Sequence, residues 1–197
     1  MFSPEIFATV FGVIFIAELP DKTAVAALVL ATRHRALPVF VGTASALIVQ
    51  SLIAVVAGGL LALLPSRPVH IGAGILFLVS AVFMWRSKEE APEVTDGEAE
   101  PANAPEPSFK SAFLKAFAVV FLAELGDLTQ LGTAALAARF RSPLTVFAAS
   151  AFALCAVAAL AVFLGNRLSR MINPGKVQKV AALVFGVLGL GFVLGWI

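Results

Sequence analysis

The sequence predicts an all-α integral membrane protein in which six transmembrane helices form two inverted three-helix repeats. Three observations lead to this prediction: an apolar composition, long uninterrupted apolar runs, and an internal repeat. Of the 197 residues, 60% are hydrophobic and only 13% are charged. A soluble domain of this length would need far more charge on its surface. The basic residues lie at the ends of apolar runs and form no basic patch, so a nucleic-acid partner is not expected.

Six apolar runs are long enough to be helices that cross the bilayer, whose hydrocarbon core takes roughly 20 helical residues. The predicted spans are residues 3–32, 37–64, 69–85, 111–138, 143–166 and 177–196. The first and fourth spans are interrupted by acidic residues. The second span carries Ser45, Gln50 and Ser51, small polar groups that we expect to form helix–helix hydrogen bonds and that are weaker candidates for a binding site. The other three spans are predicted from apolar length alone.

One hydrophilic segment, residues 86–110, separates the third span from the fourth. It contains seven acidic residues and four prolines. Low hydrophobicity combined with acids and prolines indicates a flexible linker that cannot build a core. The predicted organisation is therefore a first three-helix repeat at 1–85, an acidic proline-rich linker at 86–110, and a second three-helix repeat at 111–197.

The two halves match at a constant offset of 106 residues. Phe15-Ile-Ala-Glu-Leu-Pro-Asp-Lys-Thr23 aligns with Phe121-Leu-Ala-Glu-Leu-Gly-Asp-Leu-Thr129, and ten of the 21 positions from Phe15 to Arg35 are identical. Shared alanines and leucines are common between membrane helices. Shared Glu, Asp, Thr and Arg residues in one register are not, and they indicate an internal duplication.

An odd number of spans in each half places the second half in the opposite orientation, as in many secondary transporters. Ten Lys and Arg residues fall on the side of the linker and three on the other side. Cytoplasmic loops carry the excess of basic residues. We therefore expect a multi-pass protein of the plasma membrane, with a cytoplasmic linker and both termini outside.

Five ionisable residues lie within the first and fourth spans away from their ends: Glu18, Asp21, Lys22, Glu124 and Asp127. A charge at membrane depth costs several kcal/mol unless it is paired or faces water or an ion. The i, i+3 spacing predicts that both acids of each pair share one helix face. An ion pair between Glu18 and Lys22 remains an alternative for those two residues. Four acids against one base still require protons or a cation to hold them together.

Other residues of the two motifs complete an oxygen-rich pocket. Thr23, Thr129 and Gln130 supply neutral oxygens, and Pro20 and Gly126 occupy matching positions where a helix can open. Such breaks at corresponding positions indicate a transporter binding site. Carboxylate, hydroxyl and carbonyl oxygens suit Mn²⁺, Ca²⁺ or Mg²⁺. Neither motif has a Cys or His nearby, which disfavours soft metals and tetrahedral zinc.

Glu18-Leu-Pro-Asp-Lys-Thr23 and Glu124-Leu-Gly-Asp-Leu-Thr129 resemble the duplicated E-φ-G-D-(K/R)-(T/S) signature of the GDT family of cation/proton transporters. The resemblance covers nearly the whole chain. It implies transport of Mn²⁺ or Ca²⁺ in exchange for protons, with Glu18, Asp21, Glu124 and Asp127 as ligands and both threonines assisting. Pro20 and Leu128 depart from the signature, and Leu128 leaves the site more negative.

The sequence thus predicts a secondary transporter, not an enzyme: a proton-coupled exporter of a hard divalent cation that works by alternating access. No cofactor is expected, since the cation is the substrate and the proton the coupling ion. The expected partners are the cation and the lipid bilayer, and the pattern is compatible with a homo-oligomer. Two alternatives stay open: an amino-acid-type exporter of small solutes and a passive cation channel.

Overall fold

The computed structural model describes residues 2–19, 35–86, 108–164 and 174–195, and every regular element in these ranges is a helix. The prediction of an all-α protein is confirmed for them. The elements are α1 (Pro4–Glu18), α3 (Ala36–Leu61), α4 (Ser66–Arg86), α5 (Phe109–Ala123), α6 (Leu128–Phe140), α7 (Pro143–Ala159), η1 (Leu160–Leu164) and α9 (Pro174–Leu194). The turn η1 is a π-helical continuation of α7.

Short polar residues and prolines start several of these helices. Ser3 caps α1 by accepting a hydrogen bond from the Ile6 N–H, and Pro4 follows at the first helical position. Ser108 caps α5 in the same way. These side chains satisfy backbone donors that have no partner within the helix. The predicted linker ends next to the Ser108 cap, and residues 87–107 lie outside the described residues.

Three of the described helical stretches are long and apolar enough to cross a membrane: Ala36–Leu61, Arg67–Arg86 and Pro143–Leu164. They match the second, third and fifth predicted spans. The apolar part of α9, Gln178–Leu194, is shorter. The first predicted span is seen as α1 up to Glu18, and its continuation lies outside the described residues.

The fourth predicted span is not one continuous helix, and it opens around Gly126, one of the two positions where the sequence indicated that a helix can open. Residues 109–140 form two helices, α5 of 15 residues and α6 of 13, separated at Glu124–Asp127. Gly126 has a φ of +82°, which a right-handed helix cannot contain, and Asp127 starts α6 as its N-cap. Each half-helix is shorter than the roughly 20 residues needed to span the hydrocarbon core.

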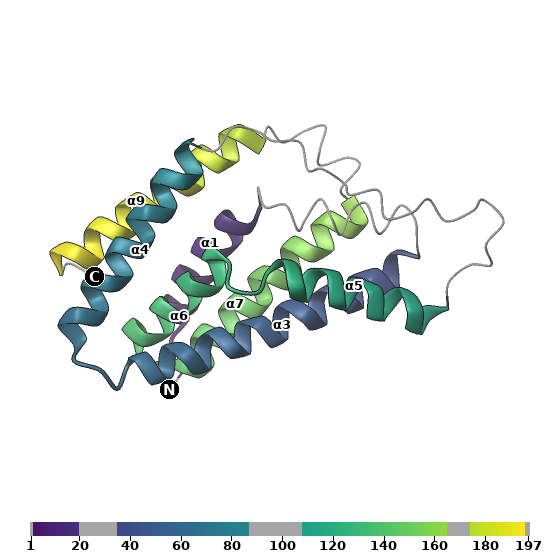
Figure 1. Ribbon diagram of the computed structural model, residues 1–197, viewed down its shortest axis with the longest axis horizontal. Coiled ribbons are helices and arrows are strands. Elements are labelled where there is room, and N and C mark those ends of the chain that lie inside the picture. Colours follow the sequence, from purple (N-terminus) through teal and green to yellow (C-terminus); the bar gives the residue numbers. More distant parts are fainter. Residues whose placement is uncertain (1, 20–34, 87–107, 165–173, 196–197) are drawn as a thin grey trace.

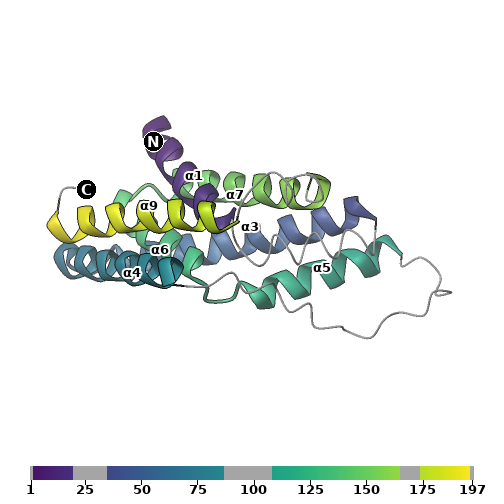
Figure 2. The same cartoon turned by 90° about the horizontal axis from the view of Figure 1, so that it is seen from above.

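The helices of the two halves interleave. At the offset of 106 residues, α1 corresponds to α5, α3 to α7, and α4 to α9. Helix α1 packs against α7, and α5 packs against α3, so each half supplies a helix that lies on the other half. Helices α3 and α7 also contact each other, and α4 lies alongside α9 (Figures 1 and 2). Exchanging the halves therefore maps this set of contacts onto itself.

The duplication is also visible in a ladder of phenylalanine rings on α1 and α5. Phe7, Phe11 and Phe15 stack in sequence along α1, with ring centroids 6.1 and 5.5 Å apart. Their counterparts Phe113, Phe117 and Phe121 stack along α5 at 6.2 and 5.6 Å. Each ladder ends three residues before a motif glutamate, Glu18 or Glu124. The repeat thus extends from the motifs into the packing of the helices that carry them.

Small residues allow α4 and α9 to approach closely. A Cβ placed on Gly74 would lie 2.9 Å from the Gly189 carbonyl oxygen and 2.6 Å from the Val193 side chain. A Cβ on Gly189 would lie 2.9 Å from the Gly74 carbonyl oxygen. Glycine pairs of this kind let membrane helices pack backbone to backbone.

The outer surface of the bundle is apolar. Large hydrophobic side chains on nearly every helix are more than half exposed, among them Val56, Phe83, Leu122, Leu144 and Val187. Soluble monomers rarely expose contiguous apolar surface on this scale. This surface suits the hydrocarbon of a lipid bilayer.

Candidate functional site

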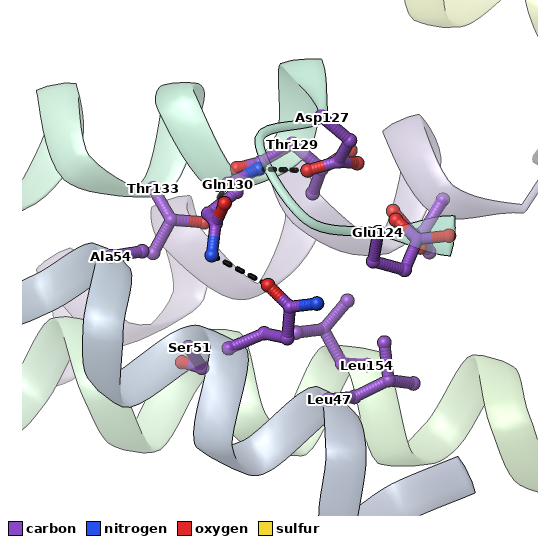
Figure 3. A pocket seen from close by; sticks show the side chains of 11 residues that line it. Leu47, Ser51, Ala54, Glu124, Asp127, Thr129, Gln130, Thr133 and Leu154 are labelled. Carbon is purple, nitrogen blue, oxygen red and sulfur yellow. Dashed lines mark hydrogen bonds between the residues drawn. The ribbon is translucent and has the colours of Figure 1, made fainter. Parts of the chain in front are cut away.

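A pocket of about 270 Å³, counting space open to the outside, lies at the break between α5 and α6 (Figure 3). Its walls come from both halves of the chain. The lining residues are Glu18 of α1, Leu47, Gln50, Ser51 and Ala54 of α3, Glu124 and Asp127 of the break, Thr129, Gln130 and Thr133 of α6, and Leu154 of α7. Of the six predicted motif residues that the structure describes, Glu18, Glu124, Asp127, Thr129 and Gln130 line this one pocket, and Gly126 forms the break beside it.

The two glutamates occupy equivalent places at helix ends. Glu18 is the last residue of α1, and Glu124 is the C-cap of α5. Both are buried, with 3% and 5% of their surface exposed. The C-terminal end of a helix carries a partial negative charge, equivalent to roughly half an elementary charge. Among the described residues, two carboxylates and two such helix ends therefore bring negative charge to the pocket.

Asp127 belongs to α6 and not to the helix that ends at Glu124. Its Oδ1 accepts a hydrogen bond of 2.7 Å from the Gln130 N–H, which makes it the N-cap of α6 (Figure 3). The prediction that Glu124 and Asp127 share one helix face is therefore wrong for this pair, because the break lies between them. They reach the same pocket from the two sides of a turn.

Two glutamine side chains join the break to α3. Gln130 Nε2 donates to Gln50 Oε1 at 2.5 Å, and Gln50 Nε2 donates to the Phe121 carbonyl at 2.7 Å. Gln130 Oε1 in turn accepts from the Gly126 N–H at 2.7 Å. Gln50 is 4% exposed although it lies in the middle of an apolar helix. Because no amide can ionise, these groups add neutral oxygens to the pocket.

The expectation that Gln50 and Ser51 form helix–helix hydrogen bonds is confirmed. The Ser51 and Ser150 hydroxyls join α3 to α7 at 2.5 Å. Gln50 and Ser51, which the sequence indicated only as weaker candidates for the site, also line the pocket, and so does Thr133, which the sequence interpretation missed. A buried glutamine within a predicted span was the available signal, but only packing shows which helix it faces.

The remaining predicted residues, Pro20, Asp21, Lys22 and Thr23, lie outside the described residues. In the ranges that the structure does describe, no three His, Cys, Asp or Glu side chains are close enough together to hold a metal ion. Glu18, Glu124 and Asp127 therefore share a pocket without forming a ligand cluster there. The pocket therefore offers hard oxygen ligands, carboxylates among them, next to a helix break.

The sequence profile of the family described as divalent cation/proton antiporter GDT1 matches the chain twice, at residues 6–92 and 112–196. The two matches start 106 residues apart, the same offset as the internal repeat. The family consists of transporters and not of enzymes, and the ion is the substrate of such a protein and not its cofactor.

Relatives of known name include PAM71, a chloroplastic protein of Arabidopsis thaliana, which is 35% identical over 94% of this chain and 55% of its own length. A GDT1-like protein of Synechocystis sp. is 29% identical over 87% of this chain and 88% of its own length. A GDT1-like protein of Schizosaccharomyces pombe is 28% identical over 91% of this chain and 78% of its own length.

The chain spans 55% of PAM71 and 60% of a chloroplastic GDT1-like protein of rice, little more than half the length of these relatives. No solved structure is significantly similar to the chain. The double profile match nevertheless covers most of its residues, including both motifs and every helix that lines the pocket. The chain belongs to the GDT1 family of divalent cation/proton antiporters.

Proposed function

We propose that this protein exports a hard divalent cation, Mn²⁺ or Ca²⁺, in exchange for protons at the pocket between α1, α3 and the break of α5 and α6. One observation carries the proposal: Glu18, Glu124 and Asp127, from both halves of the chain, line a single pocket at two helix C-termini. Broken helices whose C-terminal ends face a cavity are a recurring way to bind cations within membranes.

The ligands of the transported ion are Glu18, Asp21, Glu124 and Asp127. Thr23 and Thr129 assist as neutral oxygen ligands, and Gln130 supports the site. Hard oxygens of this kind match the preferences of Mn²⁺ and Ca²⁺. The described carboxylates do not form a metal cluster, so binding of the ion draws them inward as Asp21 completes the set.

Exchange follows from competition for the same oxygens. Carboxylates must lose their protons before they bind a metal, so cation and proton exclude each other. On the cytoplasmic side the acids release protons and take the cation, and on the outer side protons displace it. The two halves rock about the pocket at Gly126, where the helix is broken, and at its sequence counterpart, Pro20. The contacts that exchange between the halves support a pair of repeats related by a two-fold axis, which we propose to be inverted in the plasma membrane.

The test is uptake of Mn²⁺ and Ca²⁺ into proteoliposomes that contain the purified protein, with and without an imposed pH gradient. We expect cation movement that follows the proton gradient and disappears in Glu18→Gln. Glu5→Gln is the matched control, since Glu5 is an exposed acid in the first turn of the same helix. Absence of flux of both ions under every gradient, from folded wild-type protein, would refute the proposal.

A further inference from the structure

The amides of Gln50 and Gln130 form a continuous chain of hydrogen bonds that begins and ends on the broken segment. The Gly126 N–H donates to Gln130 Oε1, Gln130 Nε2 donates to Gln50 Oε1, and Gln50 Nε2 donates to the Phe121 carbonyl. Each amide uses its oxygen once as an acceptor and its nitrogen once as a donor. Turning either amide around would place two acceptors or two donors face to face.

These hydrogen bonds replace ones that the break removes. In a continuous helix the Gly126 N–H would donate to the Leu122 carbonyl, and the Phe121 carbonyl would accept from the Leu125 N–H. Backbone groups left without partners at membrane depth cost several kcal/mol each. The two side chains supply a partner to one N–H and one carbonyl of the opened segment, and so stabilise the turn that carries Glu124 and Asp127.

The chain of amides also crosses between the two halves. Gln50 lies on α3, 80 residues from Gln130 in sequence, and is buried against the break. Helix α3 of the first half thereby fixes the motif of the second half. The positions equivalent to Gln50 and Gln130 at the offset of 106 residues are Ala156 and Ala24, so the duplicated motifs do not share this device.

We infer that Gln50 and Gln130 are positioning residues: they form a clasp that holds the turn Glu124–Asp127 against α3 and thereby sets the affinity of the pocket for its cation. The second part of this inference rests on the proposed function, whereas the first part does not. Groups that orient the ligands of a metal typically contribute about 10-fold to 100-fold to its affinity.

The first experiment measures amide hydrogen exchange of the full-length protein in nanodiscs, without any cation. In Gln50→Leu and Gln130→Leu, we expect peptides that cover Glu124–Leu128 to exchange faster than in the wild type. Gln130→Leu removes the acceptor of the Gly126 N–H, and Gln50→Leu removes the partner that holds the Gln130 amide in place. The control is Thr43→Val, an isosteric change on the same helix. Thr43 is buried, and its hydroxyl has no hydrogen-bond partner among the described residues.

The second experiment measures transport kinetics of the same variants in proteoliposomes, with Mn²⁺ and with Ca²⁺. We expect KM for the transported cation to rise about 10-fold or more in each single variant, with a much smaller change in the maximal rate. Because both amides act in one chain, the Gln50→Leu/Gln130→Leu double variant should resemble either single variant and not show the product of their effects.

Each outcome discriminates. Hydrogen exchange at Glu124–Leu128 that is unchanged in both variants overturns the clasp, whatever the transport result. Hydrogen exchange that is equally faster in Thr43→Val also overturns it. Faster exchange with an unaltered KM leaves a structural brace and overturns the positioning role. Wild-type protein that transports neither cation refutes the proposed function, and the exchange measurement then still decides whether the clasp holds the turn.

Discussion

The three carboxylates of the pocket differ in their local electrostatics. Glu18 and Glu124 stand at helix C-termini, where the helix dipole opposes a negative charge, and both are buried. Asp127 stands at the N-terminus of α6, where the dipole and the Gln130 N–H favour a negative charge. The helix dipole thus disfavours a negative charge on the two glutamates, whereas Asp127 is stabilised as an anion by its own helix.

Replacing Glu124 by glutamine should abolish cation transport while leaving folding and membrane insertion intact. Glutamine has nearly the same shape but cannot carry the negative charge or exchange a proton. Transport is measured in proteoliposomes, and folding is checked by elution as a single species on size-exclusion chromatography. Normal transport by the Glu124→Gln protein would show that this carboxylate is not a ligand.

Substitutions of Asp127 can separate its role as the N-cap of α6 from its role as a ligand. Asparagine caps helices about as well as aspartate, whereas alanine at an N-cap costs about 1 kcal/mol. We expect Asp127→Asn to weaken cation binding with little change in thermal stability. We expect Asp127→Ala to lower both cation binding and thermal stability. The cation-dependent shift in Tm of the purified protein measures binding. Equal binding by the asparagine variant and the wild type would reduce Asp127 to a cap.

At the scale of elements, the contact between α4 and α9 depends on glycines, whereas the break between α5 and α6 depends on Gly126 and the amide clasp. Gly74 and Gly189 lie backbone to backbone, and neither leaves room for a Cβ. Gly72, two residues earlier on α4, has nothing within 4 Å of the place a Cβ would take. Gly74 thus has no room for a Cβ, whereas Gly72 on the same helix does.

Gly74→Ala should therefore destabilise the protein, because the added methyl group meets the Gly189 carbonyl and the backbone of Val193. Overpacking of this kind typically costs about 1–3 kcal/mol. Gly72→Ala should instead be neutral or stabilising by up to about 1 kcal/mol, since alanine is the better helix former. Thermal unfolding in detergent compares them, and a lower Tm for Gly72→Ala than for Gly74→Ala would contradict the packing seen here.

At the scale of the whole molecule, the two halves are interleaved and not placed side by side as separate domains. Each motif-bearing helix, α1 or α5, packs on a helix of the other half, and the pocket draws its carboxylates from both. A site built in this way exists only when both halves are folded together. An inverted arrangement then requires that equivalent loops face opposite sides of the membrane.

Cysteine labelling from each side tests that arrangement. Cys155 is the only cysteine of the chain, so Cys155→Ala supplies a cysteine-free background. With a membrane-impermeant maleimide on intact cells, we expect Arg67→Cys and Arg141→Cys to be labelled. Arg35→Cys and Lys110→Cys should be labelled only after the membrane is opened. Labelling of Arg35→Cys and Arg141→Cys from the same side would contradict the inverted repeat.

The sequence by itself determined the helical class and the duplication, and it singled out Glu18, Glu124 and Asp127, which line one pocket. Hydropathy sums the transfer energies of residues along a run, and so identifies α3, α4 and α7 without knowledge of their neighbours. The offset of 106 residues, first seen between Phe15 and Phe121, reappears in the paired Phe ladders. Glu18 and Glu124 were identifiable because charges are costly in an apolar run.

Only the tertiary structure decided how those acids are held. Hydropathy has no term for backbone direction, so the apolar run 111–138 did not show where α5 ends and α6 restarts; Gly126 marked only a position where a helix can open. It also cannot pair residues that are far apart in sequence. The Gln50–Gln130 hydrogen bond joins positions 80 residues apart, and it forms because folding places a buried amide of α3 against backbone groups that the break leaves open.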